Sequence, residues 1–290
     1  MHPLRSFLFA PGNHARKVEK ALGIGADAVI LDLEDAVAIA EKAATRAAVA
    51  AALGRDRRAL GYVRINGLDS DFAWGDFAAV IGPGLDGIVL PKVETADQLR
   101  TADWIMAQLE REAGLAAGGI DLLPIVETGL GLHNIEAIAA AGTRVRRLSF
   151  GAGDFTRDMN LVWTGAEDEL AYARGRIVLA SRAAGIEPPI DSVFIDLKDR
   201  ANLERSARRA HEFGFQGKLC IHPDQIGPVN AVFTPDAAEI ERAEKIIAAF
   251  REAEAAGSAS IQVDGYFVDY PIVEKAQRVL DLTERIRAAG

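Results

Sequence analysis

Short apolar runs rich in β-forming residues alternate with alanine-rich, charged stretches along most of the chain. Eight such runs occur, at residues 5–10, 28–33, 61–66, 87–91, 122–127, 147–151, 191–196 and 218–221. Strands that alternate with helices are typical of parallel sheets. The pattern therefore predicts an α/β fold in which the sheet closes into a (β/α)₈ TIM barrel.

Most of these runs are continuously apolar, for example residues 28–33 (AVILDL) and 87–91 (GIVLP). Parallel strands that helices cover on both faces have this character. The chain has 290 residues, and one α/β barrel takes about 250. A doubly wound open sheet is the alternative, and the number of strands favours the barrel.

The last part of the chain is predicted to be helical and to lie outside the barrel. Helical patterns cover residues 235–257 and 272–289, and a small flexible connection lies at residues 257–260. We therefore expect a catalytic barrel domain over residues 1–235 and a C-terminal helical extension over residues 236–290.

The charge balance excludes some classes of partner. The chain has 33 Lys and Arg against 42 Asp and Glu, a net charge of −9, whereas nucleic-acid-binding proteins usually carry a basic surface. No apolar stretch approaches the roughly 18 residues of a membrane span. The single cysteine, Cys220, excludes an internal disulfide, and the first residues lack a signal-peptide pattern. We expect a cytoplasmic protein without nucleic-acid or membrane partners.

Polar side chains collect where the predicted strands end. They include Asp32, Glu34, Asp35, Arg64, Lys92, Glu127 and Asp154. In a parallel barrel the carboxyl ends of the strands form one rim, and that rim carries the active site. The sequence thus predicts an active site with several carboxylates, one arginine and one lysine.

Glu127 and Asp154 end adjacent strands, so their carboxylates are expected to lie close together. Oxygen ligands without Cys or clustered His suit a hard cation such as Mg²⁺. We therefore expect these two residues to bind Mg²⁺ and to leave positions for substrate and water. Alternatively, each carboxylate caps the helix that follows it. Glu34 and Asp35 are equally compatible with catalysis and with a structural role.

Arg64 lies within an apolar strand, where an unpaired charge would be costly. The planar donor fork of arginine suits a substrate carboxylate or enolate. A salt bridge to Glu34 or Asp35 is the structural alternative, and the two roles are compatible.

Two weaker patterns point to anion binding. Gly151, Ala152 and Gly153 precede Asp154, and small residues let backbone N–H groups approach a substrate carboxylate. Arg16 and Lys20 belong to the helix predicted after the first strand, where a phosphate-bearing cofactor would find cations. A solvated helix face explains these two residues equally well.

Taken in order, these segments resemble the citrate lyase beta-subunit-like family, which includes malyl-CoA and citramalyl-CoA lyases. The matching segments are RSFLFAPGN (5–13), GADAVILDLEDAV (25–37), VRING (63–67), GIVLPKVE (87–94), PIVETGLGLHN (124–134), FGAGD (150–154), GFQGKLCIHPDQIGPVNAVFTP (214–235) and VDGYFVDYP (263–271). They cover nearly the whole chain, and together they are a specific signature.

The resemblance implies a barrel of the phosphoenolpyruvate-binding superfamily that holds Mg²⁺ through Glu127 and Asp154. It implies that Arg64 contacts the substrate and that Asp269 is the acid/base group. We also expect Lys92, at the same rim, to bind the substrate. In such enzymes the C-terminal segment often closes over a neighbouring subunit's site, so the resemblance implies a homotrimer or homohexamer.

The activity implied is cleavage or formation of a 3-hydroxyacyl-CoA, with acetyl-CoA and a 2-keto acid as products. CoA would then be bound near Arg16 and Lys20, and Glu34 is a further candidate for catalysis. One alternative is the beta subunit of a citrate lyase complex acting on a carrier-bound citryl thioester. Another is a non-catalytic ligand-binding relative.

Overall fold

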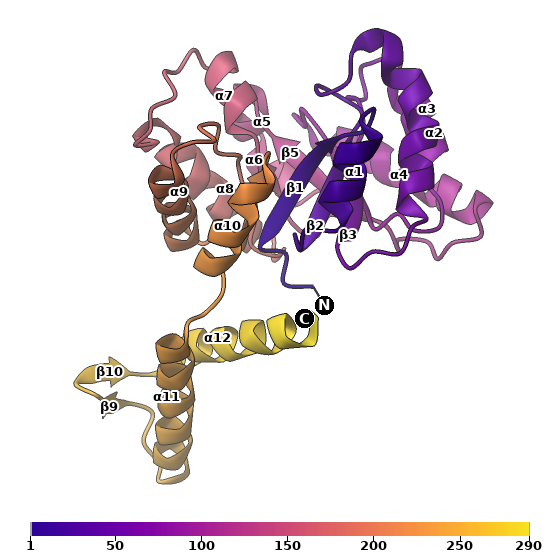
Figure 1. Cartoon of the computed structure of the whole chain (residues 1–290). Coiled ribbons are helices and arrows are strands. Elements are labelled where there is room, and N and C mark those ends of the chain that lie inside the picture. Colours follow the sequence, from indigo (N-terminus) through magenta and orange to yellow (C-terminus); the bar gives the residue numbers. More distant parts are fainter. Residues whose placement is uncertain (1, 290) are drawn as a thin grey trace. The chain divides into compact units, whose positions relative to one another are not determined.

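The computed structural model describes residues 2–289, in which eight parallel strands close into a barrel in chain order (Figure 1). The strands are β1 (Ser6–Pro11), β2 (Ala28–Asp32), β3 (Leu60–Arg64), β4 (Gly87–Leu90), β5 (Asp121–Val126), β6 (Ser149–Phe150), β7 (Ile190–Asp191) and β8 (Gly217–Cys220). β1 pairs with both β2 and β8, which closes the sheet. The predicted (β/α)₈ fold is therefore confirmed, and the open sheet is excluded.

Helices connect the strands of the barrel. They are α1 (Ala15–Leu22), α2 (Lys42–Leu53), α3 (Ala73–Val80), α4 (Ala96–Glu112), α5 (Gly129–His133), α6 (Ile135–Ala139), α7 (Ala152–Asp158), α8 (Ala171–Ala183) and α9 (Arg200–Phe213), with 3₁₀ turns η1 (Ile39–Glu41) and η2 (Asp168–Leu170). The last strand, β8, is followed by η3 (Pro223–Gln225) and α10 (Ile226–Val232). Local sequence sets their ends: Thr95 and Gln98 form a capping box that starts α4.

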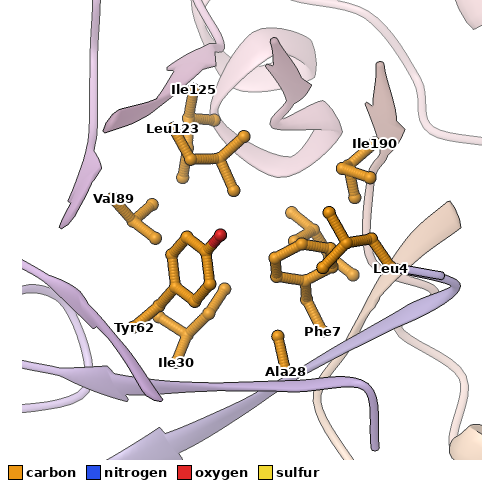
Figure 2. Packing of buried hydrophobic residues seen from close by; sticks show 10 residues of the cluster. Leu4, Phe7, Ala28, Ile30, Tyr62, Val89, Leu123, Ile125 and Ile190 are labelled. Atoms are coloured by element: carbon orange, nitrogen blue, oxygen red, sulfur yellow. The ribbon is translucent and has the colours of Figure 1, made fainter. Parts of the chain in front are cut away.

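Alternate residues of each strand point into the barrel, because successive side chains of a strand face opposite sides. Figure 2 shows the resulting core, in which Phe7, Ile30, Tyr62, Leu123 and Ile190 pack together. The rings of Phe7 and Tyr62 meet edge to face, with centroids 5.5 Å apart. This core fills the barrel, so a ligand site is left only beyond the ends of the strands.

Some predicted boundaries differ from the structure. The seventh strand, expected over residues 191–196, consists of Ile190–Asp191 alone. The chain then leaves the sheet, and the Asp196 side chain accepts a hydrogen bond from Lys198 N–H, which stabilises a turn. The last helix, α12 (Tyr270–Ala289), begins at Tyr270 instead of residue 272.

The chain divides into two compact units, Leu4–Asn230 and residues 231–289 with residues 2–3. The sequence placed this boundary a few residues later, after residue 235. The second unit contains α11 (Ala237–Ala255), a hairpin of β9 (Ile261–Val263) and β10 (Tyr266–Val268), and α12. Its own core includes Ile247, Phe250 and Val268.

The hairpin was not predicted, although its turn has a recognisable sequence. Asp264 and Gly265 join the two strands with φ angles of 50° and 82°. A two-residue turn with positive φ at both positions favours Asp-Gly and matches the twist of an antiparallel pair. In residues 2–289 no helix has both the length and the apolar character needed to cross a bilayer.

Candidate active site

A cavity of about 510 Å³ lies at the carboxyl ends of the barrel strands. Its polar side chains are those of Asp32, Asp35, Arg64, Glu127, Asp154 and Ser192, and Gly151 and Gly153 also line it. Its apolar lining includes Phe9, Ile125 and Leu219. Polar groups thus converge on a cavity with partly apolar walls, which is the usual character of a small-molecule site.

Strand geometry explains why charges gather here. Three charged residues each lie two positions after a residue of the barrel core: Asp32 after Ile30, Arg64 after Tyr62, and Glu127 after Ile125. Because side chains alternate along a strand, a residue two positions after a core residue also faces inward. The apolar core is therefore followed by a layer of buried charges.

Arg64 is held mainly by Asp32. Its Nε lies 2.8 Å from Asp32 Oδ1 and its Nη2 lies 2.5 Å from Oδ2, a bidentate pair. Its Nη1 lies 3.1 Å from Glu34 Oε2 and 3.6 Å from Asp35 Oδ2. The structure thus adds Asp32 to the ion-pair partners expected from the sequence. Burial opposes the charge, but these acids outweigh it and raise the pKa of Arg64, so its charge is permanent.

Glu127 is buried, and Asp154 lies close enough for their charges to interact. Burial raises the pKa of Glu127 to about 8, and the Asp154 carboxylate adds to this effect, whereas the Lys92 N–H and Arg64 oppose it. Glu127 Oε1 accepts a hydrogen bond of 2.8 Å from Lys92 N–H. A buried carboxylate with a raised pKa is stabilised as an anion when a cation lies next to it.

Lys92 links three of the acids. Its ammonium group pairs with Glu34 and lies 3.8 Å from Asp154 Oδ2, while its N–H binds Glu127. Its backbone has a φ of 51°, a conformation that costs energy for a residue with a side chain and that often occurs at functional sites. Glu34 and Lys92 lie beside the cavity without lining it. These contacts fit a positioning role for both residues.

Gly151 is required by close packing against Glu127. A Cβ atom at this position would lie 2.3 Å from Glu127 Oε2 and 2.9 Å from Ile125 Cγ2. At Gly153 a Cβ atom would meet only Trp163, at 3.7 Å, which is ordinary contact. The two glycines therefore differ in what they permit: only Gly151 makes room for the carboxylate.

This difference gives a matched pair of variants. We expect Gly151→Ala to displace the Glu127 carboxylate and to weaken Mg²⁺ binding by about 10–100-fold, as loss of a positioning contact does. Gly153→Ala should bind Mg²⁺ as the wild type does. Calorimetric titration of both variants checks the prediction, and equal affinities would show that Gly151 does not position the metal ligand.

The N–H groups at residues 151–153 are less available than expected. Gly151 N–H donates to Val126 O, and Ala152 N–H donates to Ser192 Oγ at 2.7 Å. A substrate carboxylate therefore cannot take either of these donors without breaking a bond within the protein. Gly153 keeps its place in the cavity lining.

The donor set fits Mg²⁺. Glu127 and Asp154 present carboxylate oxygens to one cavity, and hard oxygen ligands are what Mg²⁺ prefers. Within residues 2–289 no cluster of three or more His, Cys, Asp or Glu could hold a metal. Two protein ligands suit Mg²⁺, which is usually bound by one or two carboxylates together with waters and substrate oxygens.

Two predicted site residues of the barrel unit lie outside this cavity. Arg16 and Lys20 are exposed on α1 and do not line it. Asp269 belongs to the second unit, where it begins α12: its backbone oxygen accepts the N–H groups of Ile272 and Val273. Within its own unit Asp269 thus has a capping position at the start of α12.

Sequence reasoning placed Asp32 at this rim but did not predict its pairing with Arg64, and it did not identify Ser192 as a lining residue. Ser192 lies two positions after Ile190, which faces the barrel core, so its side chain also faces inward. Strand periodicity would have identified Ser192, had it been known which residues of this strand face inward.

The model of the HpcH/HpaI aldolase/citrate lyase family matches residues 5–223. The chain belongs to this family. The resemblance predicted from the sequence motifs is therefore confirmed, and membership places the chain among aldolases and lyases. The matched region includes every strand of the barrel and every lining residue of the cavity.

Several relatives in this family extend over the whole chain. The citrate lyase subunit beta of Leuconostoc mesenteroides subsp. cremoris is 40% identical over 284 residues, 96% of this chain and 92% of that protein. The L-malyl-CoA/beta-methylmalyl-CoA lyase of Cereibacter sphaeroides is 34% identical over 309 residues, covering 99% and 96%. The second unit is thus shared with these relatives.

A solved structure adds information about ligands. CitE from Mycobacterium tuberculosis, in complex with magnesium, acetoacetate and coenzyme A, is 29% identical with a TM-score of 0.78. The likeness covers 97% of this chain and 98% of that one. A relative with the same fold thus binds a metal, a keto acid and a CoA cofactor.

Proposed function

We propose that this protein is a Mg²⁺-dependent carbon–carbon lyase that cleaves a 3-hydroxyacyl-CoA, such as malyl-CoA or citramalyl-CoA. The products would be acetyl-CoA and a 2-keto acid, and the reverse condensation would use the same groups. The observation that carries the proposal is the pair of carboxylates, Glu127 and Asp154, in a cavity that also holds Arg64. The malyl-CoA lyase relative and the magnesium-bound CitE structure support it.

Glu127 and Asp154 would hold the metal. When bound, Mg²⁺ supplies a Lewis acid and a template for the carboxylate and hydroxyl oxygens of the acid half of the substrate. Lys92 N–H keeps one oxygen of Glu127 in place, and the backbone space at Gly151 admits the other. The chain thus contributes a preorganised pair of ligands.

Arg64 would stabilise the negative charge that develops on the substrate. Its bidentate pair with Asp32 fixes the guanidinium plane, so little reorganisation is needed during the reaction. Glu34, a candidate for catalysis, is buried between Arg64 and Lys92. We assign it to positioning these two cations, and we assign removal of the hydroxyl proton to Asp35, which lines the cavity and is exposed.

Cleavage of the C–C bond leaves its electron pair on the thioester half as an enolate, which must gain a proton at carbon. We assign this proton to Asp269 of the partner subunit, in a homotrimer or homohexamer. The assignment rests on the motif VDGYFVDYP (263–271), which resembles the corresponding segment of the acyl-CoA lyases. Exposed aromatic residues beside it, Tyr266 and Phe267, offer apolar surface for a contact between subunits.

Asp269→Asn tests this assignment. We expect turnover to fall by about 10²–10⁴-fold, the usual contribution of a positioned acid or base. Asp264→Asn, in the turn of the hairpin that precedes Asp269, is the matched control and should retain activity. Full activity of Asp269→Asn, with an unchanged oligomeric state by light scattering, would contradict the role of Asp269.

A second candidate function is the beta subunit of a citrate lyase complex, which the 40% identity to such a subunit favours. The substrate would then be a citryl thioester on a carrier protein. We assign the exposed cations Arg16 and Lys20 to binding the phosphates of CoA. Binding of a carrier-bound substrate would depend less on these two cations. Offering the same hydroxyacyl group on CoA and on a phosphopantetheinylated carrier separates the two functions: cleavage of the CoA thioester alone supports the first.

A further inference from the structure

Ser192 is a lining residue of the cavity that the proposed reaction has not used. It follows β7 and lies two positions after Ile190, which packs in the barrel core, so its side chain faces inward. It is 1% exposed, and the same cavity is lined by Glu127 and Asp154. A polar side chain this deeply buried is expected to have hydrogen-bond partners.

One partner of the Ser192 hydroxyl is known. Its Oγ accepts the Ala152 N–H at 2.7 Å, in a buried hydrogen bond. A serine hydroxyl also carries one donor hydrogen, which rotates about the Cβ–Oγ bond to reach an acceptor. Across residues 2–289 no acceptor takes this hydrogen, so it is available to a molecule in the cavity.

The other charged groups of the cavity indicate what that molecule presents. Arg64 is already paired with Asp32, and Glu127 and Asp154 cannot donate hydrogen bonds once they are ionised and hold the metal. An acidic ligand therefore meets few free donors here, and Ser192 is one of them. A hydrogen bond from a hydroxyl to a carboxylate is short and stronger than one between neutral groups.

We propose that Ser192 is a substrate-binding residue whose hydroxyl donates to the carboxylate of the 2-keto acid half of the substrate. This inference rests on the proposed function and deepens it, since it assigns a specific contact to the acid. The carboxylate would lie between the metal ligands and β7. Ser192 would then select for an acid carboxylate over a neutral group at the same place.

A purely structural role is the competing explanation. Ala152 begins α7, the helix that carries Asp154, and Gly151 before it supplies no side-chain cap. On this explanation, the only role of Ser192 is to hold α7 in place through its hydrogen bond with Ala152 N–H. In that case its removal would disturb the metal site, whereas loss of a substrate contact would leave metal binding unchanged.

The test measures the two affinities separately, using calorimetry on the full-length protein. Mg²⁺ is titrated alone, and then glyoxylate or pyruvate is titrated at saturating Mg²⁺. We expect Ser192→Ala to bind the 2-keto acid about tenfold or more weakly, the usual effect of losing a hydrogen bond to a charged group. Its Mg²⁺ affinity should equal that of the wild type, and Ser192→Thr, which keeps the hydroxyl, should recover most of the 2-keto acid affinity.

Two results would overturn this inference while leaving the proposed function intact. One is an unchanged 2-keto acid affinity in Ser192→Ala, and the other is an equal loss of Mg²⁺ affinity in that variant. A wild-type protein that binds Mg²⁺ but no 2-keto acid would instead contradict the proposed function itself, and this inference with it.

Discussion

Glu127→Gln is expected to abolish Mg²⁺-dependent turnover while making the metal-free protein more stable near pH 8. The amide keeps the size of the side chain but cannot replace an anionic metal ligand. Because even partners of metal ligands cost about 10–100-fold in affinity when removed, loss of the ligand itself should cost at least as much. Titration calorimetry of Mg²⁺ and an activity assay measure the two losses.

The gain in stability follows from the sign of the pKa shift. Burial raises the pKa of Glu127 to about 8, above its ordinary value of 4.5. Folding therefore opposes ionisation, and without metal the folded state loses stability as the pH rises from the ordinary value through about 8. Gln at this position has no charge to bury, so the stability of the variant does not fall with rising pH for this reason.

Thermal unfolding with Mg²⁺ and with EDTA makes the contrast visible. We expect Mg²⁺ to raise the melting temperature of the wild type, since a ligand that binds only the folded state stabilises it. The melting temperature of Glu127→Gln should not respond to Mg²⁺. Glu136→Gln is the control, because Glu136 is exposed and pairs with Arg176 on the barrel surface. An equal response to Mg²⁺ in Glu127→Gln would refute the metal site.

Asp191→Asn is expected to destabilise the barrel by about 3–5 kcal/mol, because it leaves buried cations without an anion. Asp191 accepts hydrogen bonds from Arg174 Nε at 2.9 Å and from Lys218 Nζ at 2.5 Å. All three side chains are 0% exposed. Glu167 also pairs with Arg174, at 2.8 Å, but cannot balance both cations alone.

Urea unfolding of the variant measures this loss. Asp97→Asn is the control, since Asp97 and Arg100 form an exposed pair that should contribute less than about 1 kcal/mol. If Asp191→Asn and Asp97→Asn had the same small effect, the buried network would not be a main source of stability.

The same network predicts a pH dependence. Burial alone would raise the pKa of Asp191, but Lys218 and Arg174 outweigh it and lower the pKa. A lowered pKa means that the carboxylate stabilises the fold above its ordinary pKa and that this contribution is lost as the pH falls through the lowered value. The wild type should therefore lose more stability on acidification than Asp191→Asn does.

The barrel and the convergence of charged side chains on one rim could be predicted because they depend on simple periodicity. Eight apolar runs with helices between them leave few folds open, and parallel strands bring residues such as Glu127 and Asp154 to one edge. The acids in Asp32-Leu-Glu-Asp35 were harder to assign. The sequence does not show which of these three carboxylates pairs with Arg64. The pairing of β2 with β3 shows it, because Asp32 lies opposite Arg64 in the register of these strands.

Other features depend on contacts between distant residues. Arg174 and Lys218 look like ordinary surface charges in the sequence, since nothing local shows that both face Asp191 between the sheet and α8. Ser192 lay inside a run that the sequence predicted to be strand, so its position directly after β7 was not recognised. The hairpin after Gly257, by contrast, had a local signal in its Asp-Gly turn.

We expect the charged rim of the barrel to cleave a hydroxyacyl thioester with Mg²⁺. The most direct measurement mixes the purified protein with malyl-CoA, citramalyl-CoA or related 3-hydroxyacyl-CoAs and follows the release of keto acid and acetyl-CoA. We predict release from at least one of them in Mg²⁺, none in EDTA, and none with Glu127→Gln. Release that is equally fast in EDTA, or in Glu127→Gln, would contradict the account.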